Sequence, residues 1–252
     1  EDAGWDGFFL WDHIQSEPGL PVADPWIALT AIALRTQHIR FGPMVTPLPR
    51  RRPEKLARET ATLDRLSNGR LVLGVGIGSD RWFHEFSTFA QAVDDKTHAA
   101  MLDEGLSVLT GLWSGQPFTF EGQHYTVRDA RFLPTPAQSP RIPIWVAGIW
   151  PNKAPFRRAA HWDGVFPIVD GPSIPPETVG EMLAYMRQQG LGDAPYDVVT
   201  SGFVGNLEPE VAAEQLRRYA DAGVTWWMEG FYWTDTVDVV RERIQQGPPS
   251  IA

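Results

Sequence analysis

The stretch from Pro53 to Gly78 constrains the fold more than any other part of the sequence. Pro53 is tolerated in a first helical turn, and Asn68-Gly69 accepts the left-handed backbone that ends a helix. The apolar run over residues 71–75 is short and partly β-branched, as in a parallel strand buried on both faces. Side chains at helical spacing precede it on one predicted helix face, namely Leu56, Thr60, Leu63 and Leu66.

Glycines at the exit of that strand form the pattern G-x-G-x-G, from Gly74 to Gly78. Ser79 stands where a dinucleotide-binding fingerprint has its third glycine, and no helix opens directly afterwards. A Rossmann site is therefore not predicted. Three glycines at a strand exit indicate tight packing or a turn more often than contact with a ligand.

Charge and cysteine content limit the partners of the chain. Its 252 residues include 22 basic and 31 acidic ones, a formal charge of −9, which disfavours nucleic acid and anionic membranes. The absence of cysteine excludes disulfides, thiolate metal sites and cysteine nucleophiles, and it fits a reducing cytoplasm. No apolar run is long enough to cross a bilayer. We expect a cytoplasmic protein with a small-molecule substrate.

Apolar strands alternate with helices along the whole chain. This alternation predicts an α/β fold, a single (β/α)8 TIM barrel over residues 1–252. A closed barrel needs an eighth strand, and because Glu1 to Gly4 is typical of a helix end, we expect the first strand upstream of residue 1. Residues 116–141 are predicted to form an insertion after the fourth strand. The seven predicted strands are 8–11, 39–46, 71–75, 144–148, 164–169, 198–204 and 224–228.

Three local patterns give further expectations. Asp24-Pro25 marks a helix start. Pro43 cannot donate to a ladder, so the strand 39–46 must bulge or end near it. The run Arg50 to Arg52 is interpreted as a solvated loop rather than a phosphate patch. The expected buried face of the helix after Asp24 consists of Ile27, Ala31 and Leu34.

Polar residues follow two of the predicted strands. Asp12-His13 come directly after strand 8–11, and Glu229 follows strand 224–228. Because α/β barrels place chemistry at the carboxyl ends of their strands, these residues are candidates for catalysis. We expect His13 to act as the acid/base, with Asp12 orienting it and Glu229 as a second candidate. The structural alternative is that Asp12 caps a loop beside a hydrogen-bonded His13.

Two further sets of residues bear on chemistry. The six histidines show no short ligand spacing, so no metal site is predicted and a metal-dependent hydrolase is disfavoured. Four tryptophans at or beyond strand exits are expected either to exclude water from a site or to pack the barrel: Trp11, Trp82, Trp150 and Trp227.

The run from Asp24 to Gly78, which includes TLDRLSNGR leading into LGVGIG, resembles the bacterial luciferase-like monooxygenase family of flavin-dependent oxidoreductases. Support continues in GWDGFFLWDHI, LDEGLSVLTGLWSGQPFTFEGQHY, FLPTPAQSPRIPIWVAG and RRAAHWDGV. The resemblance covers nearly the whole chain. It implies the barrel and the cofactor class, while the reaction varies among family members.

The resemblance also implies where a flavin or deazaflavin ring lies, across the C-terminal mouth of the barrel. In relatives that use coenzyme F420, an aspartate and a histidine matching Asp12-His13 lie beside the ring. A non-proline cis peptide supports the ring, which here implies Met44-Val45, with Thr46 next. Backbone N–H groups can face a phosphate dianion without a Cβ in the way. The implied cofactor-lining and phosphate-binding residues are Gly76, Ile77, Gly78 and Ser79, and Ala147, Gly148 and Ile149.

The leading hypothesis is an oxidoreductase that uses reduced FMN to insert oxygen into a small organic substrate, with a separate flavin reductase as partner. The alternative is hydride transfer with coenzyme F420. The sugar-phosphate dehydrogenases of the family carry a glutamate where this chain has Ser79, and the expected phosphate-binding lysines are not evident, so that reaction is not predicted. A flavin-binding protein without catalysis is the third hypothesis. The family also implies a homodimer formed through helices at the side of the barrel.

Overall fold

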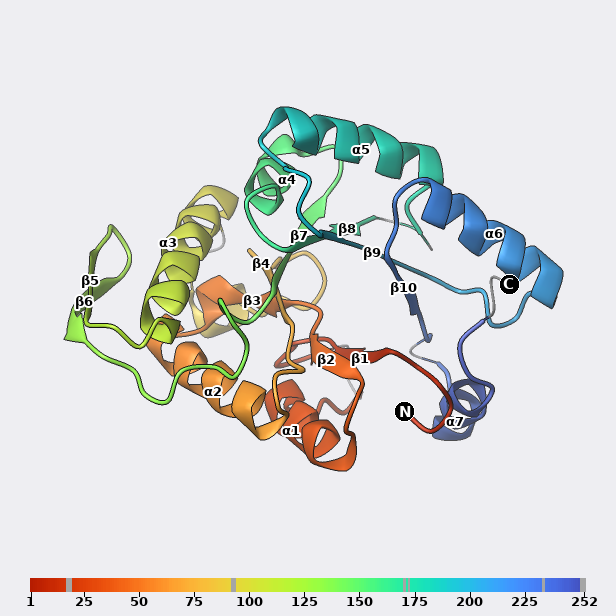
Figure 1. Cartoon of the computed structure of the whole chain (residues 1–252), viewed down its shortest axis with the longest axis horizontal. Coiled ribbons are helices and arrows are strands. Elements are labelled where there is room, and N and C mark those ends of the chain that lie inside the picture. Colours follow the sequence, from red (N-terminus) through yellow and green to blue (C-terminus); the bar gives the residue numbers. More distant parts are fainter. Residues whose placement is uncertain (17–19, 92–93, 170, 172, 233, 250–252) are drawn as a thin grey trace. The chain divides into compact units, whose positions relative to one another are not determined.

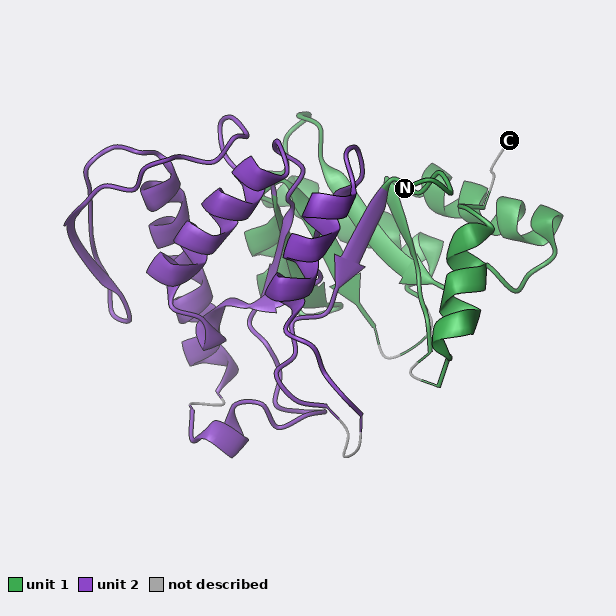
Figure 2. Ribbon diagram, turned by 90° about the horizontal axis from the view of Figure 1, so that it is seen from below, with its two compact units in different colours: residues 1–6, 144–252 green, residues 7–143 purple. Residues whose placement is uncertain are grey.

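The computed structural model describes residues 1–16, 20–91, 94–169, 171, 173–232 and 234–249. The chain divides into two compact units, coloured separately in Figure 2. Unit 1 comprises Glu1–Asp6 with Ile144–Ala252, and unit 2 comprises Gly7–Pro143. The single-domain organisation expected from the sequence stays a prediction.

The first four strands of unit 2, in chain order, pair in parallel (Figure 1). Strand β1 (Gly7–Leu10) pairs with β2 (Arg40–Pro43), and β3 (Thr46–Pro47) pairs with β4 (Leu73–Gly76). The predicted strand 39–46 is therefore interrupted after Pro43, as the missing donor of proline requires. The Met44–Val45 peptide in this interruption is cis, as the resemblance implied.

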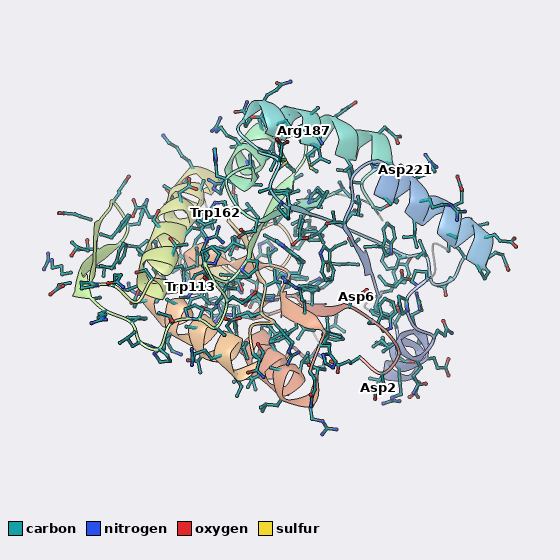
Figure 3. The ribbon with its side chains drawn as sticks, in the orientation of Figure 1. Asp2, Asp6, Trp113, Trp162, Arg187 and Asp221 are labelled. Atoms are coloured by element: carbon teal, nitrogen blue, oxygen red, sulfur yellow. The ribbon has the colours of Figure 1, made fainter. Side chains whose placement is uncertain are left out.

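Two long helices of unit 2 begin where the sequence predicts, α1 (Pro25–Arg35) and α2 (Pro53–Leu66). The third long helix of this unit is α3 (Asp95–Trp113). The Asp24 carboxylate caps α1 by accepting from the Ile27 N–H at 3.0 Å. Trp113, at the end of α3 (Figure 3), donates its indole N–H to the Ala57 carbonyl at 3.2 Å and to the Thr60 hydroxyl at 3.1 Å. Because Ala57 and Thr60 belong to α2, this indole joins the two helices.

The predicted buried face of α1 is wrong. Ile27 is 73% exposed and Leu34 63%, whereas Trp26 and Leu29 are buried. The Trp26 indole N–H donates to the Asp12 carboxylate at 3.1 Å. This polar contact fixes which side of α1 faces the strands, a choice that apolar spacing alone leaves open.

The predicted face of α2 is confirmed except at its end. Leu56, Thr60 and Leu63 are buried, whereas Leu66 is 47% exposed. Leu66 is the last residue of the helix, so its side chain lies where the chain turns away.

Residues 116–141, the predicted insertion, contain a hairpin in which β5 (Phe118–Glu121) pairs antiparallel with β6 (Thr126–Ala130). Glu104 of α3 accepts from the N–H groups of the turn, including that of His124 at 2.8 Å. Asp64 of α2 accepts from the N–H groups of Ala137 and Gln138 at 2.8 and 3.0 Å. Two carboxylates thus attach this segment to α3 and α2.

Unit 1 holds four parallel strands adjacent in chain order: β7 (Ile144–Ile149), β8 (Gly164–Ile168), β9 (Asp197–Gly202) and β10 (Trp226–Glu229). The helices that follow them are α4 (Lys153–Ala159), α5 (Pro176–Gln188), α6 (Pro209–Asp221) and α7 (Val237–Gln245), labelled in Figure 1. Asp197 accepts the indole N–H groups of Trp145 and Trp226, each at 3.0 Å, at the beginning of β9. All seven predicted strands are present.

Candidate active site

Asp12 lies directly after β1 and is only 1% exposed. Its carboxylate accepts from Trp26 Nε1 and Thr46 Oγ1 at 3.1 and 2.8 Å, and Arg50 and Arg51 donate to it from 2.8 and 2.5 Å. Burial alone raises the pKa of Asp12, but the charge and hydrogen bond of Arg51, the charge of Arg50 and the Thr46 hydroxyl lower this pKa below its ordinary value. Asp12 is therefore an ionised anchor whose oxygens are engaged.

Arg50 bridges two buried carboxylates. It ends the short helix η1 (Leu48–Arg50), which follows β3 at once and brings the arginine to the exit of β1. Its Nη2 contacts Asp12, and its Nη1 lies 2.9 Å from Glu85 Oε1. The solvated loop predicted for this arginine run is wrong for Arg50 and Arg51, which pair with Asp12; Arg52, 77% exposed, fits the prediction.

His13 forms a pair with Glu85. Nδ1 of His13 lies 2.7 Å from Glu85 Oε2, and Glu85 Oε1 accepts from the Ile14 N–H at 2.6 Å. Burial raises the pKa of Glu85, but hydrogen bonds from His13 and Ile14 and the charge of Arg50 lower it below its ordinary value. An ionised carboxylate at Nδ1 favours the tautomer that keeps the proton there, which leaves the lone pair on Nε2.

The other ring nitrogen of His13 is open. In the described part of the chain, Nε2 has no hydrogen-bond partner, and the His13 side chain is 29% exposed. The rings of Trp11 and Phe83 meet the imidazole edge to face, with centroids 5.6 and 4.8 Å away. The imidazole is thus held by a carboxylate at one nitrogen and by aromatic rings at its sides, with Nε2 free for a substrate.

The residue that orients His13 is Glu85, and the role predicted for Asp12 is corrected. Asp12 is engaged by Trp26, Thr46 and two arginines, while Glu85 contacts Nδ1. Sequence reasoning missed Glu85 because it stands 72 positions from His13 in a loop without periodicity. The available signal was a single carboxylate in the aromatic run WFHEF, directly beyond a strand exit.

The predicted cofactor residues Met44, Val45 and Thr46 lie in the interruption between β2 and β3. Met44 and Thr46 are 4% and 0% exposed, and the Thr46 hydroxyl donates to Asp12. Of the three, only Val45 is partly exposed, and contact of these residues with a cofactor stays a prediction.

The glycines of β4 are needed first for packing. A Cβ on Gly74 would lie 2.3 Å from the Pro43 carbonyl oxygen. A Cβ on Gly78, whose φ is +76°, would lie 2.7 Å from the Phe86 ring. Tight packing, the commoner meaning of such glycines, therefore applies to both positions.

The exit of β4 still offers backbone donors. Gly76 is buried at the strand end, Ile77 and Gly78 are partly exposed, and Ser79 is exposed. Within the described residues, the N–H groups of Gly78 and Ser79 donate no hydrogen bond. Unpaired, accessible backbone donors suit a ligand carbonyl or phosphate oxygen, so this exit fits the polar edge of a flavin-type cofactor.

Unit 1 contains the residues predicted to hold the phosphate. Ala147, Gly148 and Ile149 end β7, with Ile149 40% exposed, and a Cβ on Gly148 would lie 2.3 Å from Pro155 Cβ. Lys153, which follows closely, has its Nζ 3.5 Å from the centre of the Trp150 ring. Phosphate binding by these three residues stays a prediction.

Glu229, at the end of β10, is engaged within unit 1. Its side chain is 5% exposed and accepts from the Gly205 N–H at 2.6 Å and from Trp227 Nε1 at 3.2 Å. Arg243 lies 3.5 Å away. These contacts describe a carboxylate that joins the exits of β9 and β10 to α7, and its catalytic role stays a prediction.

Two searches of the described ranges bear on the alternatives. No group of three or more His, Cys, Asp or Glu side chains there has an arrangement that could hold a metal ion. Among the helices described, none combines the length and apolarity needed to cross a membrane.

A family model for luciferase-like monooxygenases matches residues 1–244. The chain belongs to this luciferase-like family. The expected fold class, a luciferase-like TIM barrel, is confirmed by solved structures. One of them, an F420-dependent secondary alcohol dehydrogenase in complex with an F420-acetone adduct, superposes with a TM-score of 0.81 over 100% of this chain and 92% of that chain, at 18% identity. At that identity the likeness shows the fold alone.

Curated members of the luciferase-like family show two kinds of chemistry. An F420-dependent glucose-6-phosphate dehydrogenase of Microbacterium testaceum is 33% identical over 156 residues, 60% of this chain and 45% of its own length. The oxygenase component of a flavin-dependent trigonelline monooxygenase of Acinetobacter baylyi is 31% identical over 133 residues, 53% of this chain and 36% of its own length. The chain thus spans less than half the length of these relatives.

Proposed function

We propose that this luciferase-like chain is an oxidoreductase that works with a flavin or deazaflavin ring, and that His13 moves the substrate proton at Nε2. The observation that carries the proposal is the His13–Glu85 pair, with Nδ1 held at 2.7 Å and Nε2 without a partner in the described chain. A carboxylate behind an imidazole orients the ring and sets which nitrogen carries the proton.

Different residues of the chain bind the cofactor, position the loop after β1 and flank His13. Backbone N–H groups of Gly78 and Ser79 bind polar atoms of the cofactor, and Val45 contacts its ring. Asp12 and Arg50 hold the exit of β1 in place through their ion pair at 2.8 Å. Trp11 and Phe83 flank His13 and hold the plane of the imidazole from its sides. When bound, the ring supplies the two-electron chemistry, and the protein contributes binding, orientation and the proton site.

Hydride transfer with coenzyme F420 is the reaction we place first, ahead of the FMN-dependent oxygenation favoured by the sequence. A relative named as F420-dependent is 33% identical over 60% of this chain, which favours F420. A hydroxyl substrate must lose a proton when it gives up a hydride. An open imidazole nitrogen backed by Glu85 meets that requirement.

Oxygenation with reduced FMN is the second candidate. The relative named as the oxygenase component of a trigonelline monooxygenase favours it, at 31% identity. This function requires oxygen and a separate flavin reductase as partner.

An anaerobic titration separates the candidates. Reduced and oxidised F420, and separately reduced FMN, are added while tryptophan fluorescence is followed, and air is then admitted. Tight F420 binding without oxygen uptake supports hydride transfer, whereas tight FMN binding with oxygen uptake supports oxygenation. Flavin binding without turnover of any alcohol, ketone or aldehyde substrate would support the non-catalytic alternative, and binding of neither cofactor would reject the proposal.

We also propose a homodimer. The exposed stripe of α1, formed by Ile27, Ala31 and Leu34, lies on a helix that the family resemblance places at the side of the barrel. Exposed apolar residues at spacings of four and three form a continuous helix face, which suits a second copy of the same helix.

A further inference from the structure

Two loops beside His13 in unit 2 are joined to each other by hydrogen bonds. They are the described residues 11–16 and 20–22, after β1, and residues 79–91, after β4. The Gln15 amide donates to the Phe83 carbonyl oxygen and, at 3.2 Å, to the Thr88 hydroxyl. Glu85 accepts from the Ile14 N–H at 2.6 Å. These hydrogen bonds hold the two loops together. The side chains that do not take part in them form one surface around Nε2 of His13.

Large apolar side chains on these loops are left in solvent. Trp11, whose ring meets that of His13, is 56% exposed. Leaving such surface in water costs about 25 cal/mol for each Å². Concentrated exposed apolar side chains mark binding sites in folded proteins. The other exposed large apolar residues of the two loops are Ile14, Leu20, Val22, Trp82 and Phe89.

The same loops lack the lysines that hold an anionic ligand. Their described residues, 11–16, 20–22 and 79–91, contain three acidic residues, one arginine and no lysine, and Asp12 and Glu85 are paired with Arg50 and Arg51. The arginine, Arg81, has its guanidinium 5.4 Å from the centre of the Trp82 ring. The two lysines of unit 2 lie elsewhere, Lys55 in an ion pair with Glu59 on α2 and Lys96 in the first turn of α3. The described residues of these loops thus offer no lysine to a substrate phosphate.

Unit 1, taken by itself, presents aromatic surface after two of its strands. The rings of Phe203 and Tyr232, beyond β9 and β10, stack with centroids 4.4 Å apart and an interplanar angle of 8°. Tyr232 is 52% exposed. This is a second, independent set of aromatic side chains at strand exits.

We infer that the substrate is a small, uncharged, mainly apolar alcohol or ketone, held by the aromatic surface of the two loops with its oxygen at Nε2 of His13. The inference rests on the proposed function for the role of His13. In the oxidising direction, the hydroxyl proton goes to Nε2, and the carbinol hydrogen leaves with two electrons as hydride to oxidised F420. This substrate class separates the chain from relatives named for glucose 6-phosphate.

Binding of probes tests the inference apart from activity. The affinities of cyclohexanone, 1-phenylethanol and glucose 6-phosphate are measured by calorimetry, with and without F420, for the wild type and for Trp11→Ala and Trp82→Ala. We expect the apolar probes to bind and each Trp variant to weaken them about tenfold, a change of ~1.4 kcal/mol. Leu133→Ala, which removes a side chain 56% exposed on another segment of unit 2, is the matched control and should change nothing.

Three results would overturn the inference. They are glucose 6-phosphate binding that Arg81→Ala weakens, apolar affinity unchanged in both Trp variants, and no binding of either apolar probe under both conditions. Thermal melts show whether each variant is folded. Turnover by His13→Ala is measured in parallel: full turnover with intact probe binding rejects the role of His13 but leaves the substrate class standing.

Discussion

At the scale of single residues, the site depends on which carboxylate meets which cation. Asp12 and Glu85 are both buried, and Arg50 contacts both. Buried charges are tolerated only when they are paired, so these residues form a unit in which the loss of one member leaves the others uncompensated. His13 is attached to this unit through Glu85, and for that reason its orientation depends on residues that never contact substrate.

His13→Ala should lower turnover by about 10²–10⁴-fold, the usual contribution of a general acid or base. Added imidazole should restore part of that turnover, because it can occupy the space left by the side chain. Glu85→Gln should lower kcat more than it raises KM and should not respond to imidazole, since the ring is still present but poorly oriented. Glu59→Gln, an exposed change on α2, is the control. Unchanged turnover in both His13→Ala and Glu85→Gln would show that His13 takes no part in the reaction.

Acid should destabilise the protein through the same carboxylates. The folded-state pKa values of Asp12 and Glu85 lie below their ordinary values. Their contribution to stability is therefore complete above the unfolded pKa values, about 4, and is lost as pH falls through the lower folded values. Denaturant unfolding at pH 7, 5 and 3 measures this loss as a fall in the free energy of unfolding.

The matching variant is Asp12→Asn. It should be less stable than the wild type at pH 7, and the difference should shrink as pH falls below about 4, because the unfolded wild-type carboxylate, with its higher pKa, takes up a proton before the folded one does. Asp221→Asn, at the exposed end of α6, should follow the wild type at every pH. A constant gap between Asp12→Asn and the wild type would contradict this account.

At the scale of elements, buried side-chain hydrogen bonds decide how helices and connections are attached. Trp113 joins α3 to α2, and Trp26 turns α1 toward Asp12. Asp64 of α2 accepts three hydrogen bonds from Ala137 and Gln138, between 2.7 and 3.0 Å. Each of these contacts uses a polar atom that would cost free energy if it were left buried and unpaired.

Asp64→Ala should lower the free energy of unfolding by about 2–3 kcal/mol, because it leaves donors of the 137–138 segment without their acceptor. Urea denaturation measures the change. Glu59→Ala, on the same helix but exposed in its ion pair with Lys55, should cost no more than about 0.5 kcal/mol. Equal losses in the two variants would mean that Asp64 does not anchor the connection.

At the scale of the whole molecule, α1 is the helix that bears on the proposed homodimer. Its stripe of Ile27, Ala31 and Leu34 is apolar at helical spacing and yet exposed. A stable interface needs roughly 800 Å² from each partner, so this stripe can form only the centre of one.

Light scattering of the double variant Ile27→Asp, Leu34→Asp should show a monomer where the wild type is a dimer. Charged residues at the centre of an apolar interface lose their hydration without a partner, which outweighs the association free energy. Val211→Asp, at a 55% exposed position on α6, should leave the dimer intact. If the wild type is a monomer, the homodimer proposal is wrong. If the double variant is still a dimer, the interface does not depend on α1.

The sequence by itself determined the order of elements, the interruption at Pro43 and the place of Asp12 and His13, because proline chemistry, helix caps and apolar runs act over a few residues. The resemblance of its motifs indicated the family. Only the tertiary structure decided which face of α1 is buried, what Arg50 and Arg51 contact, and that Glu85 rather than Asp12 holds His13. These outcomes depend on pairs of charges and indole donors that lie far apart in the chain. No local pattern reports such pairing, since a buried carboxylate is matched by whichever cation the fold brings near it.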